Sequence, residues 1–346
     1  MTRRVELVVD SLRGQRVPID LPLAYRVPVE AARDELGIPS TVDLSDPIVG
    51  KAVALLGAAH RANPVVRVAV FGGTAHRLTC PSSNAPDLGL RHELHDLDVA
   101  VLLKERNSFL SLLSTVAGTE GSGLTFFETA GDQIFNSTSD GRRLRWHMVV
   151  AEEGSEIVLG TLDIIADDFE FCHRMDVRED VASAASHGWT LAPTHLLIAK
   201  GQFVQRIPRE DAALVPDRVL EPFGKHEVVI GPEEKDVRDL LALLLDHPVA
   251  ESPGGISSAE LSRLLGSDWG LWKTVGLNLG MVARSPILRG LPPSMRSRVE
   301  GRLKQLRELV GSLTPKRRFA FLGGPWWQEV DATAVTDTKV PTAGPT

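Results

Sequence analysis

The spacing of apolar residues along the first half of the chain is that of short buried strands. Apolar runs at 65–71 and 97–103 have strand length, and two further strands are predicted at 143–151 and 157–166. The polar connector EEGSE joins the last two runs, so we expect them to form a hairpin. This half of the chain therefore predicts a β-sheet.

Helical spacing marks the remainder. Helices are predicted at 46–62, where Pro47 suits the first turn, and at 107–117, between the predicted strands. Beyond about residue 180 the periodicity is helical throughout. The helices expected there cover 194–206, 233–245, 257–265, 269–283 and 293–312. The predicted fold class is α/β of the α+β kind, with a mixed sheet first and helices afterwards.

The length of 346 residues fits two domains with extensions. We predict an N-terminal extension at 1–45, which contains the strand-like run VELVVD, and a sheet-containing domain at 46–180. A helical domain is expected at 181–330. The last segment, 331–346, has little apolar content to bury and is predicted to be disordered.

The composition is that of an ordinary globular protein, 43% hydrophobic and 24% charged. No apolar run approaches the roughly 18 residues needed to span a bilayer, and the apolar stretch after the basic N-terminus is too short for a signal peptide. A cytoplasmic location without membrane contact is therefore expected. Cys80 and Cys172 form no CxxC pair, so packed thiols are favoured over a zinc site or a disulfide.

Charge is unevenly distributed along the chain. The net charge is −7, yet the segment 281–318 holds ten basic and two acidic residues and carries +8, which leaves −15 for the remainder. Such asymmetry is typical of a polyanion-binding face on an acidic protein. A solvated helix surface is the alternative interpretation.

The most informative chemistry lies at the start of the second strand. Asp96 and Asp98 are two residues apart, so on a strand both side chains point to one side, while Leu97 and Val99 point into a core. Two adjacent carboxylates repel each other and are costly to bury without a partner. The pair therefore predicts a divalent cation, Mg²⁺ or Mn²⁺, whose free positions take substrate phosphates.

Gly72, Gly73 and Thr74 follow the first strand. Glycines let the backbone approach a triphosphate closely and present N–H donors to it, and Thr74 adds a hydroxyl. Such a turn is common by itself. Together with the Asp pair on the next strand it predicts a nucleotide-binding site.

A third carboxylate is needed if two metal ions are to be bridged. Asp163, in the otherwise apolar run VLGTLDIIAD, is the candidate metal ligand or general base. The alternative is a strand residue that faces solvent. Asp167 and Asp168 follow at the strand end and are interpreted as turn residues.

The order of strand, Gly-Gly-Thr, Asp-hydrophobic-Asp and a later strand Asp resembles the nucleotidyltransferases of the DNA polymerase beta superfamily. Within that superfamily it is similar to the AbiEii-like toxins, which include the mycobacterial MenT proteins. The resemblance covers about residues 65–246, with a longer interval (76–93) before the Asp pair than the smallest members have. Arg91 lies where the family often has an arginine. The resemblance implies that 46–180 is a nucleotidyltransferase catalytic domain.

Two later helical motifs also resemble those of the family. LAPTHLLIAKGQ makes Lys200 the candidate phosphate-binding lysine, and EEKDVRDLLALLLD supplies Asp236 and Asp239. Asp236 and Asp239 share one helix face because they are three residues apart. A surface lysine and an exposed charged face opposite the leucine stripe are the alternatives.

These residues predict a metal-dependent enzyme that moves a nucleotide from an NTP to an acceptor. The resemblance implies that the acceptor is tRNA, reached through 281–318, and that the protein is a toxin of a toxin–antitoxin or phage-defence system with a cognate antitoxin. Transfer to a small-molecule or protein hydroxyl is an alternative. A catalytically silent nucleotide-binding or regulatory protein is another.

Two further patterns have ordinary interpretations beside their functional ones. Residues 257–283 resemble a helix-turn-helix, but such helix pairs are common in helical domains. The tryptophans Trp269, Trp272, Trp326 and Trp327 are expected to pack between helices rather than to stack on bases. The histidines His92, His95 and His173 show no ligand spacing and are assigned no role.

Overall fold

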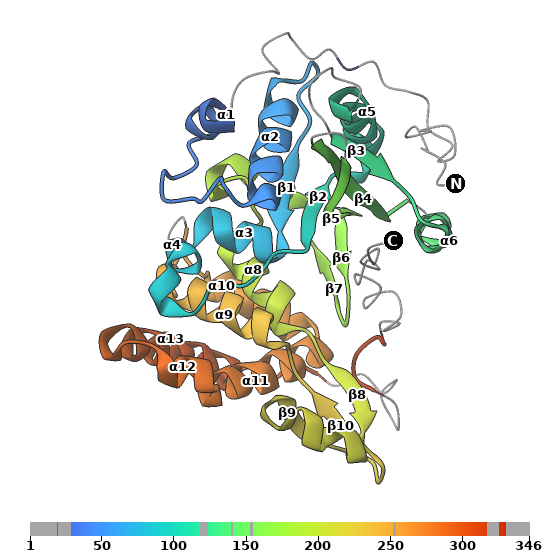
Figure 1. Cartoon of the computed structure of the whole chain (residues 1–346). Coiled ribbons are helices and arrows are strands. Elements are labelled where there is room, and N and C mark those ends of the chain that lie inside the picture. The colour runs from blue at the N-terminus through green and yellow to red at the C-terminus, as the bar shows by residue number, and fades with distance from the viewer. Residues whose placement is uncertain are drawn as a thin grey trace.

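The computed structural model describes residues 19, 29–117, 124–139, 141–152, 155–251, 254–316 and 325–329. The strand-like run at 5–10 and the tail at 331–346 lie outside these residues. Figure 1 shows the sheet and its helices in one half of the described structure and the later helices in the other.

The central sheet has five strands in the order β1-β2-β5-β4-β3. Their bounds are β1 Val68–Phe71, β2 Asp96–Val101, β3 Leu124–Phe127, β4 Arg143–Glu152 and β5 Ser155–Ala166. β2 runs parallel to β5, and the other neighbours are antiparallel. The mixed sheet and the β4–β5 hairpin confirm the sequence prediction, whereas β3 was not predicted.

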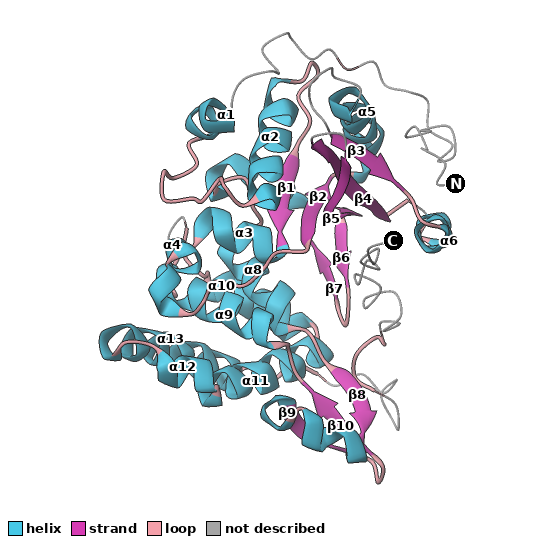
Figure 2. Cartoon of the chain, viewed as in Figure 1, coloured by secondary structure: helices cyan, strands magenta, loops and turns pink. Residues whose placement is uncertain are grey.

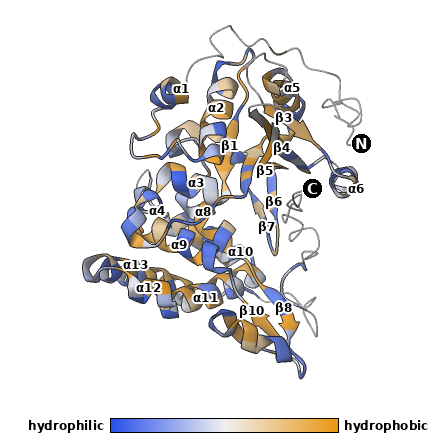
Figure 3. Cartoon of the chain, in the orientation of Figure 1, coloured by the Kyte–Doolittle hydropathy of each residue, from blue (hydrophilic) through white to orange (hydrophobic). Residues whose placement is uncertain are grey.

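One face of this sheet is apolar. Alternating residues of β2 and β5, such as Leu97, Val99, Leu162 and Ile164, are buried there. The helix α2 (Pro47–Arg61) contacts β1, β2 and β5, and α5 (Arg106–Ala117) packs beside it. Figure 3 shows the hydrophobic colouring of β1.

The helix α2 begins where the sequence predicted. Asp46 caps it by accepting hydrogen bonds from the backbone N–H groups of Ile48 and Val49, and Pro47 occupies its first turn. The preceding helix, α1 (Val29–Leu36), packs on α2. Capping and one apolar face thus fix the helix that covers the strands.

The interval between the first two strands is mostly helical. It contains α3 (Gly72–Thr79) and α4 (Pro81–Asn84), two helices that the sequence did not predict. Beyond β3 and β5 lie the short α6 (Ala130–Thr138), α7 (Arg178–Ala182) and a hairpin of β6 (Asp168–Glu170) and β7 (Arg174–Asp176). Single 3₁₀ turns cover Pro86–Leu88, Leu103–Glu105, Ala184–His187, Arg209–Leu214 and Pro216–Arg218.

The second half is predominantly helical, as expected (Figure 2). Its helices are α8 Pro193–Gly201, α9 Glu234–Asp246, α10 Ser258–Ser267, α11 Trp269–Arg284, α12 Pro286–Gly290 and α13 Pro293–Ser312. The helix predicted at 194–206 ends earlier, because the chain turns into a small sheet. That sheet, β8-β10-β9, is formed by β8 Gln205–Pro208, β9 Val219–Phe223 and β10 Glu227–Ile230, and was not predicted.

A single cluster of buried apolar side chains extends from Ala32 through the central sheet to Val310 in α13. The helices α3 and α4 connect the two halves, since α9 packs on both. The boundary at 180/181 stays a prediction. Among the described residues, none of the helices combines the length and apolarity that crossing a bilayer requires.

Candidate active site

Three aspartates of neighbouring strands lie side by side on the polar face of the sheet. Asp98 in β2 is the register partner of Asp163 in β5 and, on its other side, of Phe71 at the end of β1. Asp96 precedes Asp98 by two residues and so projects to the same face. The sheet therefore brings together the carboxylates that the sequence singled out.

The glycine turn after β1 is in direct contact with this cluster. Gly72 has φ +66°, and a Cβ there would lie 1.9 Å from Oδ2 of Asp98. Only glycine fits, because it has no Cβ and populates positive φ without strain. Thr74 is buried, and its Oγ1 donates a hydrogen bond of 3.2 Å to the backbone carbonyl of Asp96. The threonine therefore ties the turn to β2.

Asp98 is the least compensated carboxylate of the cluster. Burial raises its pKa well above the ordinary value, and the nearby carboxylates of Asp96 and Asp163 add to the shift. No hydrogen bond reaches its side chain from any residue in the described ranges. Asp96, by contrast, accepts a 2.6 Å hydrogen bond from Oγ1 of Thr161. Asp98 thus has the environment of a group that lacks a cation partner.

Asp163 has a protein cation instead. Nε of Arg145 in β4 donates to Oδ1 of Asp163 at 2.6 Å, and Nη2 donates to Oδ2 at 2.7 Å. Burial raises the pKa of Asp163 although Arg145 opposes the shift. The bidentate pair occupies both carboxylate oxygens and holds Asp163 toward β4.

The surroundings of the three aspartates determine which of them can ligate a divalent cation. Among the described residues, no group of three or more His, Cys, Asp and Glu side chains is arranged to hold a metal ion. The Asp96 and Asp98 pair offers hard oxygen donors, and the uncompensated Asp98 fits a cation. Asp163 does not fit as a third ligand while it is bound to Arg145. The residues therefore fit one divalent cation held by two aspartates.

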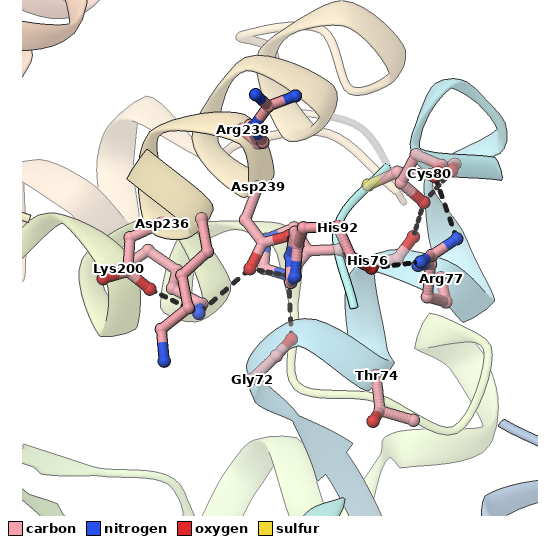
Figure 4. Close-up of polar contacts among 12 residues, drawn as sticks. Gly72, Thr74, His76, Arg77, Cys80, His92, Lys200, Asp236, Arg238 and Asp239 are labelled. Carbon is pink, nitrogen blue, oxygen red and sulfur yellow. Dashed lines mark hydrogen bonds and ion pairs between the residues drawn. The ribbon is translucent and has the colours of Figure 1, made fainter. Parts of the chain in front are cut away.

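Lys200 lies beside the glycine turn in a buried ionic network (Figure 4). Its Nζ is 2.6 Å from Oδ1 of Asp236 and 2.9 Å from Oδ2 of Asp239. Burial alone would lower the pKa of Lys200, but these two carboxylates raise it. Lys200 therefore bridges the two aspartates that the second of the later helical motifs supplied.

Histidines connect this network to Gly72 and Gly73. His92 Nε2 is 2.8 Å from Oδ1 of Asp239, and His76 Nδ1 is 2.8 Å from the carbonyl of Gly72. A Cβ on Gly73 would lie 3.2 Å from His92 Cε1 and 3.8 Å from Asp239 Oδ2. Burial alone would raise the pKa of Asp239, but Lys200 and the two histidines hold that pKa far below its usual range.

Other predicted features occupy separate places. Arg91 pairs with Asp43 at 2.9 Å. The basic segment is described to residue 316, and most of its basic side chains are exposed. Its exposed basic residues are Arg284, Arg289, Arg298, Lys304, Arg307 and Lys316. Arg302 instead donates hydrogen bonds to the carbonyls of Leu244 and Leu245. Both free cysteines are buried, as the sequence predicted. Trp326 and Trp327 are also buried, but they pack against side chains of the small sheet, such as Phe223 and Val229, and not only between helices.

Three residues of the site were not predicted from the sequence: Arg145, His76 and His92. Arg145 had a readable signal, because Arg143, Arg145 and His147 alternate with apolar residues along the predicted strand at 143–151. The histidines had none. His92 meets Asp239, which lies 147 positions away in sequence, only through tertiary packing.

Comparison of the chain with protein-family models, curated proteins and solved structures found no match.

Proposed function

We propose that this protein is a metal-dependent nucleotidyltransferase that transfers a nucleotide from an NTP to an acceptor hydroxyl. Asp96 and Asp98 hold Mg²⁺ or Mn²⁺, and Gly72, Gly73 and Lys200 face the leaving pyrophosphate. When bound, the cation neutralises the charge of the phosphates. The acceptor approaches Asp163.

The observation that carries this proposal is the state of Asp98. Its carboxylate has a pKa raised by burial beside two further aspartates, and it stands against the Cα of a glycine whose φ is positive. A buried cluster of acids is destabilising by itself. A bound cation removes that cost, and the adjacent glycine backbone gives a phosphate close access to the cation.

The glycine turn supplies donors for the phosphates. Gly72 and Gly73 open α3, so their N–H groups have no acceptor within the helix. Lys200 contributes charge, since an ammonium group has three donors and Asp236 and Asp239 use two of them. The third donor can point at a phosphate oxygen. The two aspartates then act as positioning residues that keep Lys200 charged and fixed.

The transfer step assigns a role to Asp163. The acceptor oxygen bonds to the α-phosphorus while the bond from that phosphorus to the bridging oxygen breaks, and pyrophosphate leaves. The hydroxyl proton passes to Asp163, whose raised pKa suits a general base. Positioning and electrostatics supply most of the rate enhancement in such chemistry.

The acceptor is proposed to be tRNA, and the protein a toxin with a cognate antitoxin. This part rests on the resemblance to AbiEii-like toxins and on the exposed basic side chains of α13, such as Arg298, Lys304 and Arg307. Incubation with total tRNA, candidate proteins and small hydroxyl compounds in competition distinguishes the acceptor classes.

The test is transfer of radiolabel from each of the four NTPs to these acceptors in Mg²⁺. Asp98→Asn removes the charge and keeps the shape, and we expect label transfer to fall at least a hundredfold, roughly the effect of losing one well-placed charged group. Asp217→Asn, at an exposed aspartate outside the site, is the matched control. Equal transfer by wild type and Asp98→Asn would remove the assigned site.

A second candidate function is a nucleotide-binding protein without transferase activity. The bidentate Arg145–Asp163 pair favours it, because a carboxylate held on both oxygens by a guanidinium is less able to accept the proton of the acceptor hydroxyl. Calorimetric titration with a non-hydrolysable NTP, with and without Mg²⁺, distinguishes the two. Metal-dependent binding supports the enzyme, and binding that is indifferent to metal supports the silent protein.

A further inference from the structure

A pocket of about 460 Å³ lies at the start of β4, on the β4 side of the sheet and away from the glycine turn. The β6–β7 hairpin and α6 supply its other walls. It is lined by Phe135, Ser139, Arg142, Arg143, Asp168, Glu170 and Arg174. Three of these residues are arginines and two are acids, so the lining carries a formal charge of +1.

Arg143 is the unusual member of this pocket. Its guanidinium lies over the rings of both Phe135 and Phe171, 5.1 Å from each ring centroid. Within the described ranges its side chain donates no hydrogen bond and makes no ion pair with a carboxylate. Arg142 and Arg174, in contrast, both pair with Asp168, at 3.0 and 2.6 Å.

A stacked guanidinium with unused donors is suited to an anion. Contact with the two rings restrains its guanidinium, and arginine pairs with phosphate through two parallel hydrogen bonds. Burial lowers the pKa of Arg143, and the carboxylates of Asp163 and Glu170 oppose that shift without pairing with its guanidinium. Asp168 neutralises one of the two remaining arginines.

The pocket adjoins the aspartate cluster. Arg143 and Arg145 are two residues apart on β4, so they project from the same face, and Phe135 contacts both guanidinium groups. Arg145 in turn holds Asp163. The polar face of the sheet thus leads from Asp98 through Asp163 and Arg145 to Arg143.

In an in-line displacement the entering and leaving oxygens lie on opposite sides of the phosphorus. If pyrophosphate leaves toward Gly73 and Lys200, the acceptor enters from the β4 side. We infer that the pocket of Arg142, Arg143 and Arg174 binds a phosphate ester of the acceptor and so places its hydroxyl at Asp163. The placement of the acceptor hydroxyl at Asp163 rests on the proposed function. The binding of a phosphate ester in the pocket does not depend on that function.

The same phosphate chemistry can come from a nucleic-acid strand or from a phosphorylated small molecule. The probes are therefore penta-uridylate, ribose 5-phosphate and inorganic phosphate, each titrated calorimetrically into the full chain. Penta-uridylate binding alone identifies a strand, and ribose 5-phosphate binding of equal strength identifies a small acceptor. If none of the three binds at millimolar concentration, the inference is overturned.

Arg143→Ala tests the residue itself. We expect its affinity for the binding probe to fall about tenfold or more, the usual effect of losing a charged hydrogen-bonding partner. Arg143→Lys should recover part of the loss, since it restores charge without the planar stack. Arg178→Ala, at an exposed arginine that does not line the pocket, is the control and should bind as wild type does. Unchanged binding by Arg143→Ala overturns the inference.

Two further measurements keep the outcome decisive. If Arg143→Ala does not fold, the double variant Arg142→Ala, Arg174→Ala carries the test, because both side chains are exposed and both line the pocket. Equal binding by that variant and wild type likewise overturns the inference. Binding of a non-hydrolysable ATP analogue with Mg²⁺ is measured in parallel. Its absence from wild type rejects the proposed enzyme, while probe binding that depends on Arg143 still supports the pocket.

Discussion

The Cα of Gly72 faces the carboxylate of Asp98 so closely that a methyl group there would stand 1.9 Å from Oδ2. Gly72 cannot gain a side chain unless Asp98 moves. The part of β2 that carries Asp98 and the glycine turn after β1 are therefore one structural unit. Substitutions can separate the steric contact in this unit from the charge of Asp98 and from its binding of a cation.

Gly72→Ala tests the steric part. The left-handed φ of +66° costs a non-glycine residue about 1 kcal/mol, and the clash with Asp98 adds to that cost. Gly224 has the same φ of +66° with nothing within 4 Å of a built Cβ, so Gly224→Ala is the matched control. We expect Gly72→Ala to lower the free energy of unfolding by at least 2 kcal/mol, roughly twice the loss in the control. Urea denaturation of both variants measures the difference. Equal losses would show that the contact with Asp98 is relieved at no cost.

The raised pKa of Asp98 predicts a dependence of stability on pH. The folded protein keeps the proton at pH values where the unfolded chain has released it, so stability falls as pH rises from the ordinary value of 3.8 through the raised pKa. Asp98→Asn cannot lose a proton there. In EDTA, the variant should be more stable than wild type near neutral pH, and the difference should disappear below 3.8.

Adding Mg²⁺ should make wild type more stable than Asp98→Asn. The cation binds the ionised carboxylates of Asp96 and Asp98 and stabilises the folded wild type by mass action. Thermal unfolding of both proteins at neutral pH with and without Mg²⁺ checks this. A variant that gains as much from Mg²⁺ as wild type would contradict the assignment of Asp98 as a ligand.

Arg145→Ala should be strongly destabilising, by roughly 3 kcal/mol, because it leaves Asp163 without its partner while the carboxylate stays largely buried. Replacing both partners, as in Arg145→Ala with Asp163→Asn, should recover much of the loss. A double-mutant cycle by chemical denaturation measures the coupling. Additive losses would mean that the pair contributes little.

Lys200→Met removes the only lysine that contacts Asp236 and Asp239 within the described structure. Asp236 then loses its ion-pair partner and Asp239 keeps only its contacts with His92 and His76. We expect a loss of roughly 3 kcal/mol in the free energy of unfolding together with weaker NTP binding. Lys235→Met, in the first turn of α9, is the control, since Lys235 is exposed and pairs with Glu233 at 3.5 Å. Denaturation and nucleotide titration of both variants provide the comparison.

The exposed basic side chains of α13 predict salt-dependent binding of RNA. Reversing Arg298, Lys304 and Arg307 to glutamate should weaken tRNA binding. The slope of log affinity against log salt should fall by about 0.7 to 0.9 for each phosphate that the variant no longer neutralises. The control reverses Arg209 and Lys225, which are exposed outside this helix. Equal slopes in all three proteins would show that α13 is a solvated face.

The elements whose position depends on local pattern could be predicted from the sequence. The bounds of α13 and of the β4–β5 hairpin agree with the apolar spacing to within two residues. The three strands β8, β9 and β10 were missed, because each has four or five residues and most of their side chains are only partly buried, which leaves little alternation to read.

In the candidate site, too, some features follow from neighbouring residues in the sequence and others only from tertiary packing. The sequence by itself determined that Asp96 and Asp98 share one side of a strand and that a glycine pair follows the strand before it, because both follow from the geometry of consecutive residues. Tertiary structure alone decided that Asp163 lies beside Asp98 yet is held by Arg145, and that Lys200 is enclosed by two aspartates. These contacts join residues far apart along the chain, and their charges are set by burial, which no local pattern records.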